Sequence, residues 1–198
     1  MKSLGLQNVK AFRDTKDIEL APITLFVGKN SCGKSSLIRF PVVMSQTFKS
    51  SSDTPICLHA PLTSFIDYGN FEDVVHQGGP VNDSFSVRLE YGINVKDFDP
   101  DSQKRMSLTT IYKKGLKHEN RAQISITYSV ISKSRLFATD IQLYIDGTLF
   151  SSFELKDKPH STDDQDITEY IFRQWKTVKN GGLIDTPEYE YNVKTREI

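Results

Sequence analysis

Residues 28–35 read Gly28-Lys29-Asn30-Ser31-Cys32-Gly33-Lys34-Ser35 and match G-x-x-x-x-G-K-[ST], the pattern of a glycine-rich loop that surrounds phosphate groups. The apolar run at 23–27, which follows Pro22, predicts a strand that is buried on both faces in a parallel sheet. Residues 35–49 then have the pattern of a helix. A strand, this loop and a helix in succession predict a nucleoside triphosphate site.

The backbone of the loop explains its glycines. Gly28 and Gly33 let the main chain approach the phosphates closely. Successive N–H groups from about Asn30 to Ser36 are expected to form an anion-binding nest at the positive end of the following helix.

The side chains of the loop supply the remaining chemistry. Lys34 is expected to provide a cation for the β- and γ-phosphates, and the Ser35 hydroxyl is placed to ligate Mg²⁺. Ser36 is expected to contact the α-phosphate. Cys32 is either a small filler of a variable loop position or a thiol activated by the helix N-terminus. The residues expected at this site are Gly28, Asn30, Ser31, Cys32, Gly33, Lys34, Ser35 and Ser36.

The composition sets limits on the class of protein. A chain of 198 residues buries roughly 70% of its unfolded surface, which suffices for a single core or for one large domain with a subdomain. Its formal net charge of zero argues against a surface devoted wholly to nucleic acid. The chain lacks a long apolar run and a signal-like start, and it has only two cysteines. We therefore expect a cytoplasmic protein with no membrane segment.

The segments on either side of the loop predict its surroundings. We expect strands at 2–9 and 17–20, with a turn at 13–16 between them. In the helix after the loop, Pro41 should cause a kink, and the inward face is expected to contain Leu37, Ile38, Val42, Val43 and Phe48. Residues 64–80 are rich in polar and aromatic side chains and have the composition of a functional loop.

From residue 84 onward the apolar residues recur at every second position, which predicts an antiparallel sheet with one solvated face. Asp146-Gly147 is typical of a tight hairpin turn, and residues 166–179 predict a helix with Tyr170, Ile171, Trp175 and Val178 inward. The expected strands contain residues 85–91, 106–112, 124–130, 141–145 and 150–155. We divide the chain into a P-loop core at 1–83, an antiparallel β subdomain at 84–160, and a helix with the start of a further part at 161–198.

The order of these segments resembles the first half of an ABC-type ATPase head, as in the SMC, RecF and OLD families. Leu6 to Arg13 is similar to their "L-x-N-F-[KR]-x-F" signature, with Val9 in place of the aromatic residue. The loop is similar to their "G-x-N-x-[SA]-G-K-S-[ST]-L-[IL]" core, with Cys32 as the small residue. Residues 67–76 resemble a "G-x-F-x-[ED]-[LV]-[VI]" block of bacterial OLD-like ATPases, including those of Septu-type and retron-associated antiphage systems.

This resemblance implies an α/β fold, namely the P-loop core half of an ABC-ATPase-like head with an attached antiparallel β-meander. It implies ATP and Mg²⁺ as cofactors. It places Lys10 and Arg13 near the nucleotide, although ordinary solvated charges are the alternative for both. Gln77 is the candidate for the Gln that ligates Mg²⁺ in related heads, and a polar turn residue beside Gly78 is the alternative.

The resemblance also implies motifs that the chain does not show convincingly. These are a Walker B run ending in Asp-Glu, an L-S-G-G-like signature and a switch His. Leu143-Tyr144-Ile145-Asp146 is followed by Gly147 and has the pattern of a hairpin. We therefore name no catalytic residue, and we expect the N-terminal part of a longer ATPase that binds ATP without efficient hydrolysis.

The expected partners follow from the same resemblance. They are a second ATP-bound head in a homodimer, a nuclease that is fused or associated, and possible DNA. Basic residues that could face DNA, or could be ordinary solvated hairpin charges, are Lys113, Lys114, Lys117, Arg121, Lys133 and Arg135. A stand-alone module that senses nucleotide without turnover is the alternative function, and a phosphotransferase is disfavoured because no lid arginines follow the loop.

Overall fold

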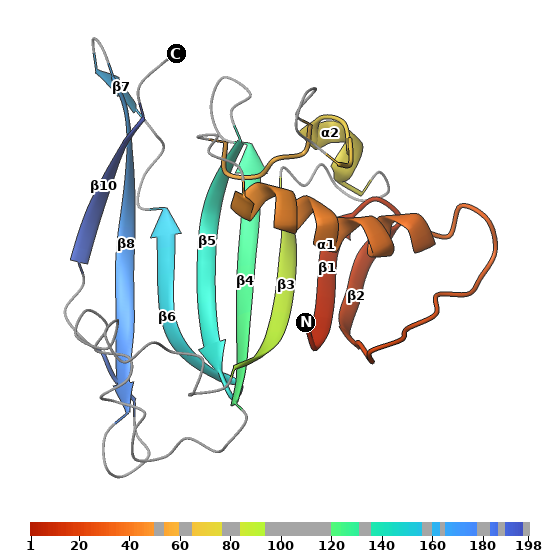
Figure 1. Cartoon of the computed structure of the whole chain (residues 1–198). Coiled ribbons are helices and arrows are strands. Elements are labelled where there is room, and N and C mark those ends of the chain that lie inside the picture. Colours follow the sequence, from red (N-terminus) through yellow and green to blue (C-terminus); the bar gives the residue numbers. More distant parts are fainter. Residues whose placement is uncertain are drawn as a thin grey trace.

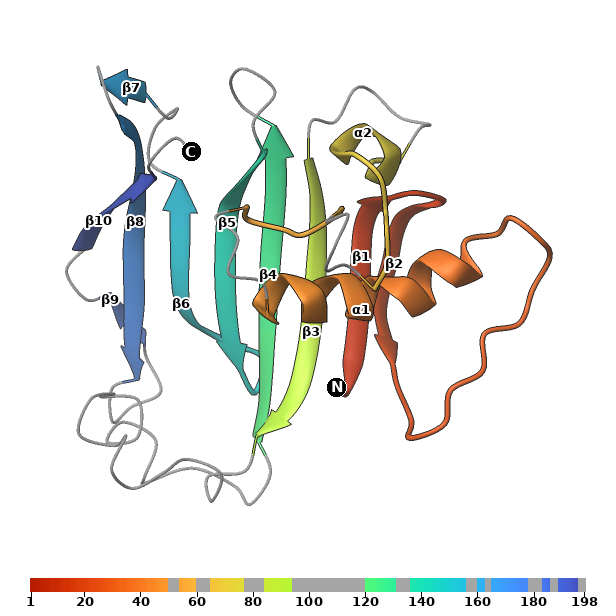
Figure 2. The ribbon, with the colours of Figure 1, turned by 45° about the horizontal axis from the view of Figure 1, so that its top comes forward.

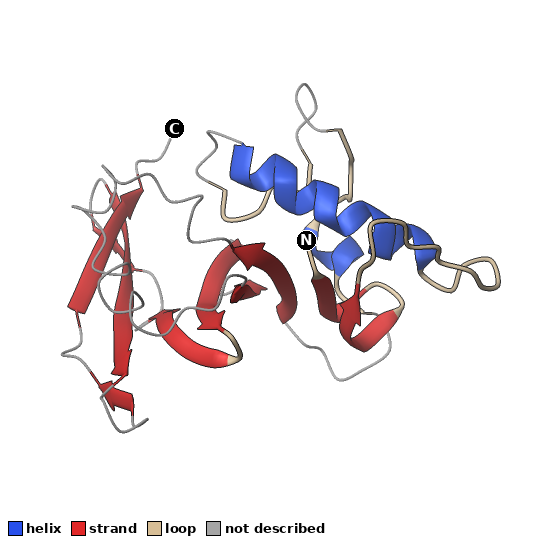
Figure 3. Cartoon of the chain, turned by 60° about the horizontal axis from the view of Figure 1, so that its bottom comes forward, coloured by secondary structure: helices blue, strands red, loops and turns tan. Residues whose placement is uncertain are grey.

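The structure is a computed structural model of the chain. It describes residues 1–49, 54–59, 65–76, 84–93, 120–130 and 136–155, together with the backbone of strands at 160–162, 165–177, 183–185 and 189–195. Within these residues a long antiparallel sheet is crossed by one long helix (Figure 1). Both helices lie on the same side of the sheet (Figure 3).

The sheet continues through all three ranges into which the sequence was divided. Its strand order is β10-β8-β6-β5-β4-β3-β1-β2, and β7 and β9 pair with β8. The strands are β1 (Ser3–Val9), β2 (Phe12–Glu19), β3 (Ser84–Ile93), β4 (Asn120–Val130), β5 (Leu136–Ile145), β6 (Thr148–Leu155), β7 (His160–Thr162), β8 (Gln165–Thr177), β9 (Leu183–Asp185) and β10 (Tyr189–Thr195). The helices are α1 (Lys34–Lys49) and α2 (Phe71–Val74).

The alternation of apolar residues predicted the meander correctly. In β3 the side chains of Phe85, Val87 and Leu89 are buried, whereas the residues between them are only half-buried. The hairpin between β5 and β6 turns at Asp146 and Gly147, whose φ angles of 49° and 78° are those of the predicted tight turn. The expected strand at 106–112 lies outside the described residues.

Helix α1 covers the apolar face of β3, β1 and β2 and runs across the strands (Figure 2). Its buried residues are Leu37, Phe40, Val43, Met44 and Gln46. The expected inward face was wrong for Ile38 and Phe48, which are 57% and 59% exposed. The helix has more apolar residues than one face can hold, and the Leu37–Phe40–Met44 row is the one that meets the sheet. The helix continues through Pro41.

A buried amide joins α1 to the segments that follow it. The side-chain amide of Gln46 donates to the carbonyl oxygens of Cys57, at 2.7 Å, and Ile66, at 3.0 Å. Its carbonyl oxygen accepts from the Ile66 N–H at 3.3 Å. Thr47 Oγ1 also accepts from the Cys57 N–H. The chain around Cys57 and Ile66 is thereby held against the helix by side chains rather than by a strand ladder.

The turn between the first two strands is earlier than expected. Val9 pairs with Phe12, so the chain reverses at Lys10 and Ala11 and not at 13–16. Lys10 has a φ of 50°, which supplies the left-handed conformation that such a turn needs. Residues 13–16 are polar because β2 is an edge strand with a solvent-facing side, and they belong to the strand itself.

The run at 23–27 is not a strand in the structure, contrary to expectation. Ile23, Leu25 and Val27 are 84%, 83% and 89% exposed, and only Phe26 packs against the core. A parallel strand forms only beside a neighbouring strand. Among the residues that the structure describes, no strand lies next to this run.

The helix expected at 166–179 is also wrong, because residues 165–177 form β8. This strand pairs with β6 over Ser151–Leu155 and with β10 over Tyr189–Thr195. The spacing of its apolar residues fits a helix, yet Thr, Tyr, Ile, Phe and Trp all favour strands. Pairing with strands on both sides decides the outcome.

No helix within the described ranges has the length and apolar character needed to cross a membrane.

Replacement of Gln46 by leucine should destabilise the fold, because the polar groups of Cys57 and Ile66 would be buried without their partner. We expect the free energy of unfolding to fall by about 2–3 kcal/mol, measured by urea denaturation followed by circular dichroism. The neighbouring exposed Ser45 provides the control, and Ser45→Ala should change stability little. Equal stability of the two variants would contradict the role assigned to Gln46.

Candidate functional site

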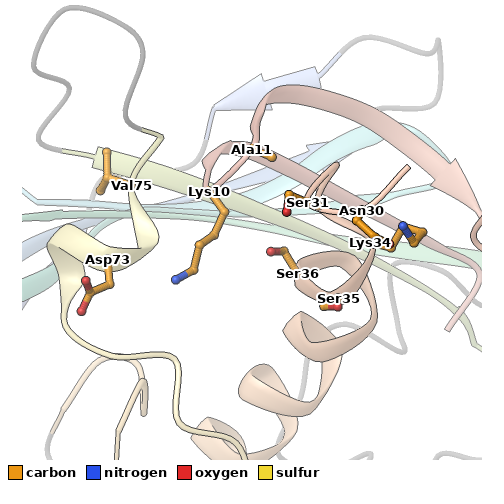
Figure 4. A pocket seen from close by; sticks show the side chains of 10 residues that line it. Lys10, Ala11, Asn30, Ser31, Lys34, Ser35, Ser36, Asp73 and Val75 are labelled. Carbon is orange, nitrogen blue, oxygen red and sulfur yellow. The ribbon is translucent and has the colours of Figure 1, made fainter. Parts of the chain in front are cut away.

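A cavity of about 680 Å³ lies where three parts of the chain meet (Figure 4). The first part is the turn of the β1–β2 hairpin, the second is the glycine-rich loop with the start of α1, and the third is α2. The lining residues are Lys10, Ala11, Asn30, Ser31, Gly33, Lys34, Ser35, Ser36, Asp73 and Val75. Cavities of this size hold cofactors and small molecules.

The loop backbone contains left-handed residues of the kind that an anion nest needs. Ser31 and Gly33 have φ angles of 62° and 96°, both in the left-handed region. Alternation of left- and right-handed residues turns successive N–H groups toward one side. Helix α1 begins at Lys34 with no acidic residue in its first turn, so the N–H groups of that turn remain available to an anion.

Gly33 is required by a close contact as well as by its backbone angle. A Cβ atom at this position would lie 2.5 Å from Cζ and 2.6 Å from Cε2 of Phe12, and 3.1 Å from Cβ of Ala11. The ring of Phe12 therefore packs directly on the loop backbone. This contact fixes the hairpin turn beside the start of α1.

The side chain of Lys34 is hydrogen-bonded to the first residues of the glycine-rich loop. Its ammonium donates to the carbonyl oxygens of Gly28, at 2.9 Å, and Lys29, at 2.5 Å. The Sγ atom of Cys32 lies 3.8 Å from the same ammonium. The structure thus brings Gly28 and Cys32 next to Lys34, although neither of them lines the cavity.

A second lysine enters the cavity from the hairpin turn. The backbone N–H of Lys10 donates to the carbonyl oxygen of Val74 at 2.6 Å, and His76 Nδ1 donates to the carbonyl oxygen of Lys10 at 2.6 Å. The side chain of Lys10 extends toward the space between Asp73 and Ser36 (Figure 4). The resemblance placed Lys10 beside the nucleotide, and the structure places it beside the loop.

Tyr68 connects this lysine to the helix. Its ring centroid lies 4.9 Å from the Lys10 ammonium, and its hydroxyl donates to the carbonyl oxygen of Ser36 at 3.1 Å. Tyr68 is only 6% exposed. Burial raises the pKa of its hydroxyl, so the group keeps its proton and remains a donor.

Sequence reasoning did not single out Asp73 and Val75 from the block at 67–76, and it did not identify Ala11. Asp73 belongs to α2 and faces the cavity from the side opposite the loop (Figure 4). Its carboxylate accepts from the N–H of Asn70 at 2.9 Å. The spacing Asn70-x-x-Asp73 is that of a helix capping box and could have located α2 from the sequence.

Other expected site residues lie elsewhere. Arg13 is on β2 and does not line the cavity, and Gln77 lies outside the described residues. Asp146, which the sequence assigned to a hairpin rather than to a Walker B motif, is a turn residue whose carboxylate accepts from the Arg121 N–H at 2.8 Å. Arg121 itself forms an ion pair with Glu90 at 3.1 Å. The other basic residues proposed to face DNA, namely Lys113, Lys114, Lys117, Lys133 and Arg135, are outside the described residues.

The groups in the cavity fit a nucleoside triphosphate with Mg²⁺. Two ammonium groups, from Lys10 and Lys34, and the N–H groups of the loop suit the negative oxygens of a polyphosphate. The hydroxyl of Ser35 and the carboxylate of Asp73 are oxygen donors of the kind that Mg²⁺ prefers. Within the described ranges there is no cluster of three or more His, Cys, Asp or Glu side chains that could hold a metal ion.

Replacement of Gly33 by alanine should distort the loop, since the new Cβ collides with Phe12 and the φ of 96° is strained for alanine. We expect a loss of about 1–3 kcal/mol in the free energy of unfolding, measured by thermal or urea denaturation. Gly92→Ala is the matched control, because its Cβ meets only the flexible end of Lys2. Similar stability of both variants would argue against the contact of Phe12 with Gly33.

Comparison with protein families identifies the class of this loop and sheet. The family model described as an AAA domain matches residues 3–180, which include the hairpin, the loop, both helices and most of the sheet. Comparisons with curated proteins and with solved structures gave no match. The chain therefore belongs to the AAA domain family, within the P-loop NTPase superfamily.

Proposed function

We propose that this chain is the ATP-binding lobe of an ABC-type ATPase head of the OLD, RecF and SMC class. The observation that carries the proposal is the cavity in which the hairpin turn, the loop and α2 converge. The family match supports a nucleotide-binding ATPase domain. The ABC-type assignment goes further, and it is supported by Lys10, which the N-terminal signature places at the nucleotide and which lines the same cavity as Lys34.

The lobe is proposed to act in a dimer of ATP-bound heads that regulates a nuclease or another DNA-acting partner in antiphage defence. ATP acts there by binding one arrangement of the heads more tightly than another. Support comes from the block at 67–76, whose pattern resembles bacterial OLD-like ATPases. In the structure this block supplies Asp73 and Val75 to the cavity wall.

The exposed run at 23–27 supports completion of the lobe by further strands. Ile23, Leu25 and Val27 alternate along this segment and have more than four-fifths of their surface in solvent. Such a segment gains both hydrogen bonds and apolar burial when strands pair beside it. We propose that the same additional polypeptide brings the acidic residue that activates water.

A nucleotide-sensing module that does not hydrolyse ATP is the second candidate. One observation favours it: Asp73 is the only carboxylate among the residues that line the described cavity, and it already accepts a hydrogen bond from Asn70. A general base for water would need a free carboxylate in line with the γ-phosphate.

Replacement of Lys34 by alanine tests the site itself. We expect affinity for a fluorescent ATP analogue with Mg²⁺ to fall about 10- to 100-fold, the effect of losing a charge-assisted contact to phosphate. The circular dichroism spectrum should stay unchanged. Lys49→Ala, at the exposed far end of α1, is the control and should bind normally. Unchanged affinity after Lys34→Ala would refute the assignment of the loop.

The rate of ATP hydrolysis by the chain alone distinguishes a complete catalytic site from one that lacks catalytic groups. The chain alone should bind ATP yet release phosphate far more slowly than the roughly 1–10³ s⁻¹ of typical enzymes. A phosphate-release assay at saturating ATP measures this rate. Turnover within the ordinary range would show that this chain contains all the catalytic groups, and the proposed completion by other strands would then be wrong.

A further inference from the structure

We propose that Tyr68 is a positioning residue for ATP binding, because its ring holds the ammonium of Lys10 in the cavity while its hydroxyl fixes the ring to the first turn of α1. The inference rests on the proposed function and extends it to a residue outside the loop and the N-terminal signature. Tyr68 does not line the cavity, so it acts through Lys10.

Three contacts hold Tyr68 in place, through its ring, its hydroxyl and its backbone. It packs edge-on against Phe40, with ring centroids 5.5 Å apart and an interplanar angle of 81°. Its hydroxyl donates to the carbonyl oxygen of Ser36, and its backbone N–H donates to the carbonyl oxygen of Leu58. A ring held in this way offers a constant face to the Lys10 ammonium, 4.9 Å from its centroid.

The segment at 65–76, which carries Tyr68, contacts both the backbone and the side-chain ammonium of Lys10. The backbone of Lys10 is bonded to Val74 and His76, and the neighbouring Val9 forms an isolated bridge with Val75. The ammonium of the same lysine lies over Tyr68. A free lysine side chain loses up to about 2 kcal/mol of rotamer entropy when a ligand orders it. Here most of that ordering precedes binding, which favours affinity.

An aromatic ring is a suitable support because it leaves the positive charge uncancelled. In the part of the chain that the structure describes, no carboxylate lies within ion-pair distance of the Lys10 ammonium. A salt bridge would have to be broken, or shared, when phosphate arrives. The face of an aromatic ring attracts a cation. The side of the ammonium that points away from the ring can still contact an anion.

The experiment replaces Tyr68 by phenylalanine, 4-fluorophenylalanine and 3,5-difluorophenylalanine in the full chain. Fluorine weakens the attraction of the ring for a cation with little change in size. Each variant is made with Lys10 present and with Lys10→Met, and the affinity for a fluorescent ATP analogue with Mg²⁺ is measured. With Lys10 present we expect the affinity to fall stepwise, by about 3- to 5-fold across the series. With Lys10→Met the affinity should be the same for all three rings.

Equal dependence on fluorination in the two backgrounds, including no dependence in either, would overturn the role of Tyr68. Absence of ATP binding by the unsubstituted chain would overturn the proposed function and this inference together, so the two failures are distinguishable. Thermal denaturation identifies any variant that does not fold. The second measurement is a double-mutant cycle, in which the ATP affinities of Tyr68→Leu, Lys10→Met and the double variant are compared. If the losses of the two single variants add up to the loss of the double variant, the proposal is rejected.

Discussion

The packing of the Phe12 ring on the backbone of Gly33 is the contact on which the rest of the site depends. Phe12 begins β2 directly after the turn at Lys10 and Ala11, so the ring fixes where that turn lies relative to the loop. Only glycine permits both the approach and the left-handed φ at residue 33. The contact therefore joins an edge of the sheet to the start of α1, and the cavity is the space left beside it.

The core below the cavity makes this arrangement rigid. Phe85 of β3 contacts the rings of Phe40, Phe71 and Tyr128, with centroids between 5.2 and 6.2 Å apart. These rings come from α1, α2 and β4, so one cluster of aromatic side chains fixes both helices to the sheet. Burial of large rings contributes more stability than any other single group in such a core. Hydrogen bonds from Gln46 and Tyr68 then set the path of the intervening segments.

Local signals in the sequence were sufficient for the loop, for α1 and for the hairpin at Asp146-Gly147, because each is determined by residues close together in the chain. Contacts between distant residues account for the errors. The run 165–177 has the spacing of a helix, but pairing with β6 and β10 makes it a strand. The run 23–27 has the composition of a buried strand, but burial needs neighbours. The positions of Lys10 and Asp73 across one cavity could not be derived from spacing either, since the residues lie on separate elements.

The charges in the cavity explain why the hairpin turn matters to a phosphate site. The loop contributes the ammonium of Lys34 to the cavity wall, and this group is already bonded to two loop carbonyl oxygens. Lys10 adds a second positive charge that no carboxylate within the described residues neutralises, and Asp73 adds one negative charge on the far wall. A polyphosphate with Mg²⁺ carries several negative oxygens and one divalent cation, so the ammonium groups of Lys10 and Lys34 suit its oxygens, and the hydroxyl of Ser35 and the carboxylate of Asp73 suit its cation. This arrangement of charges supports the proposal that the cavity binds a nucleoside triphosphate with Mg²⁺.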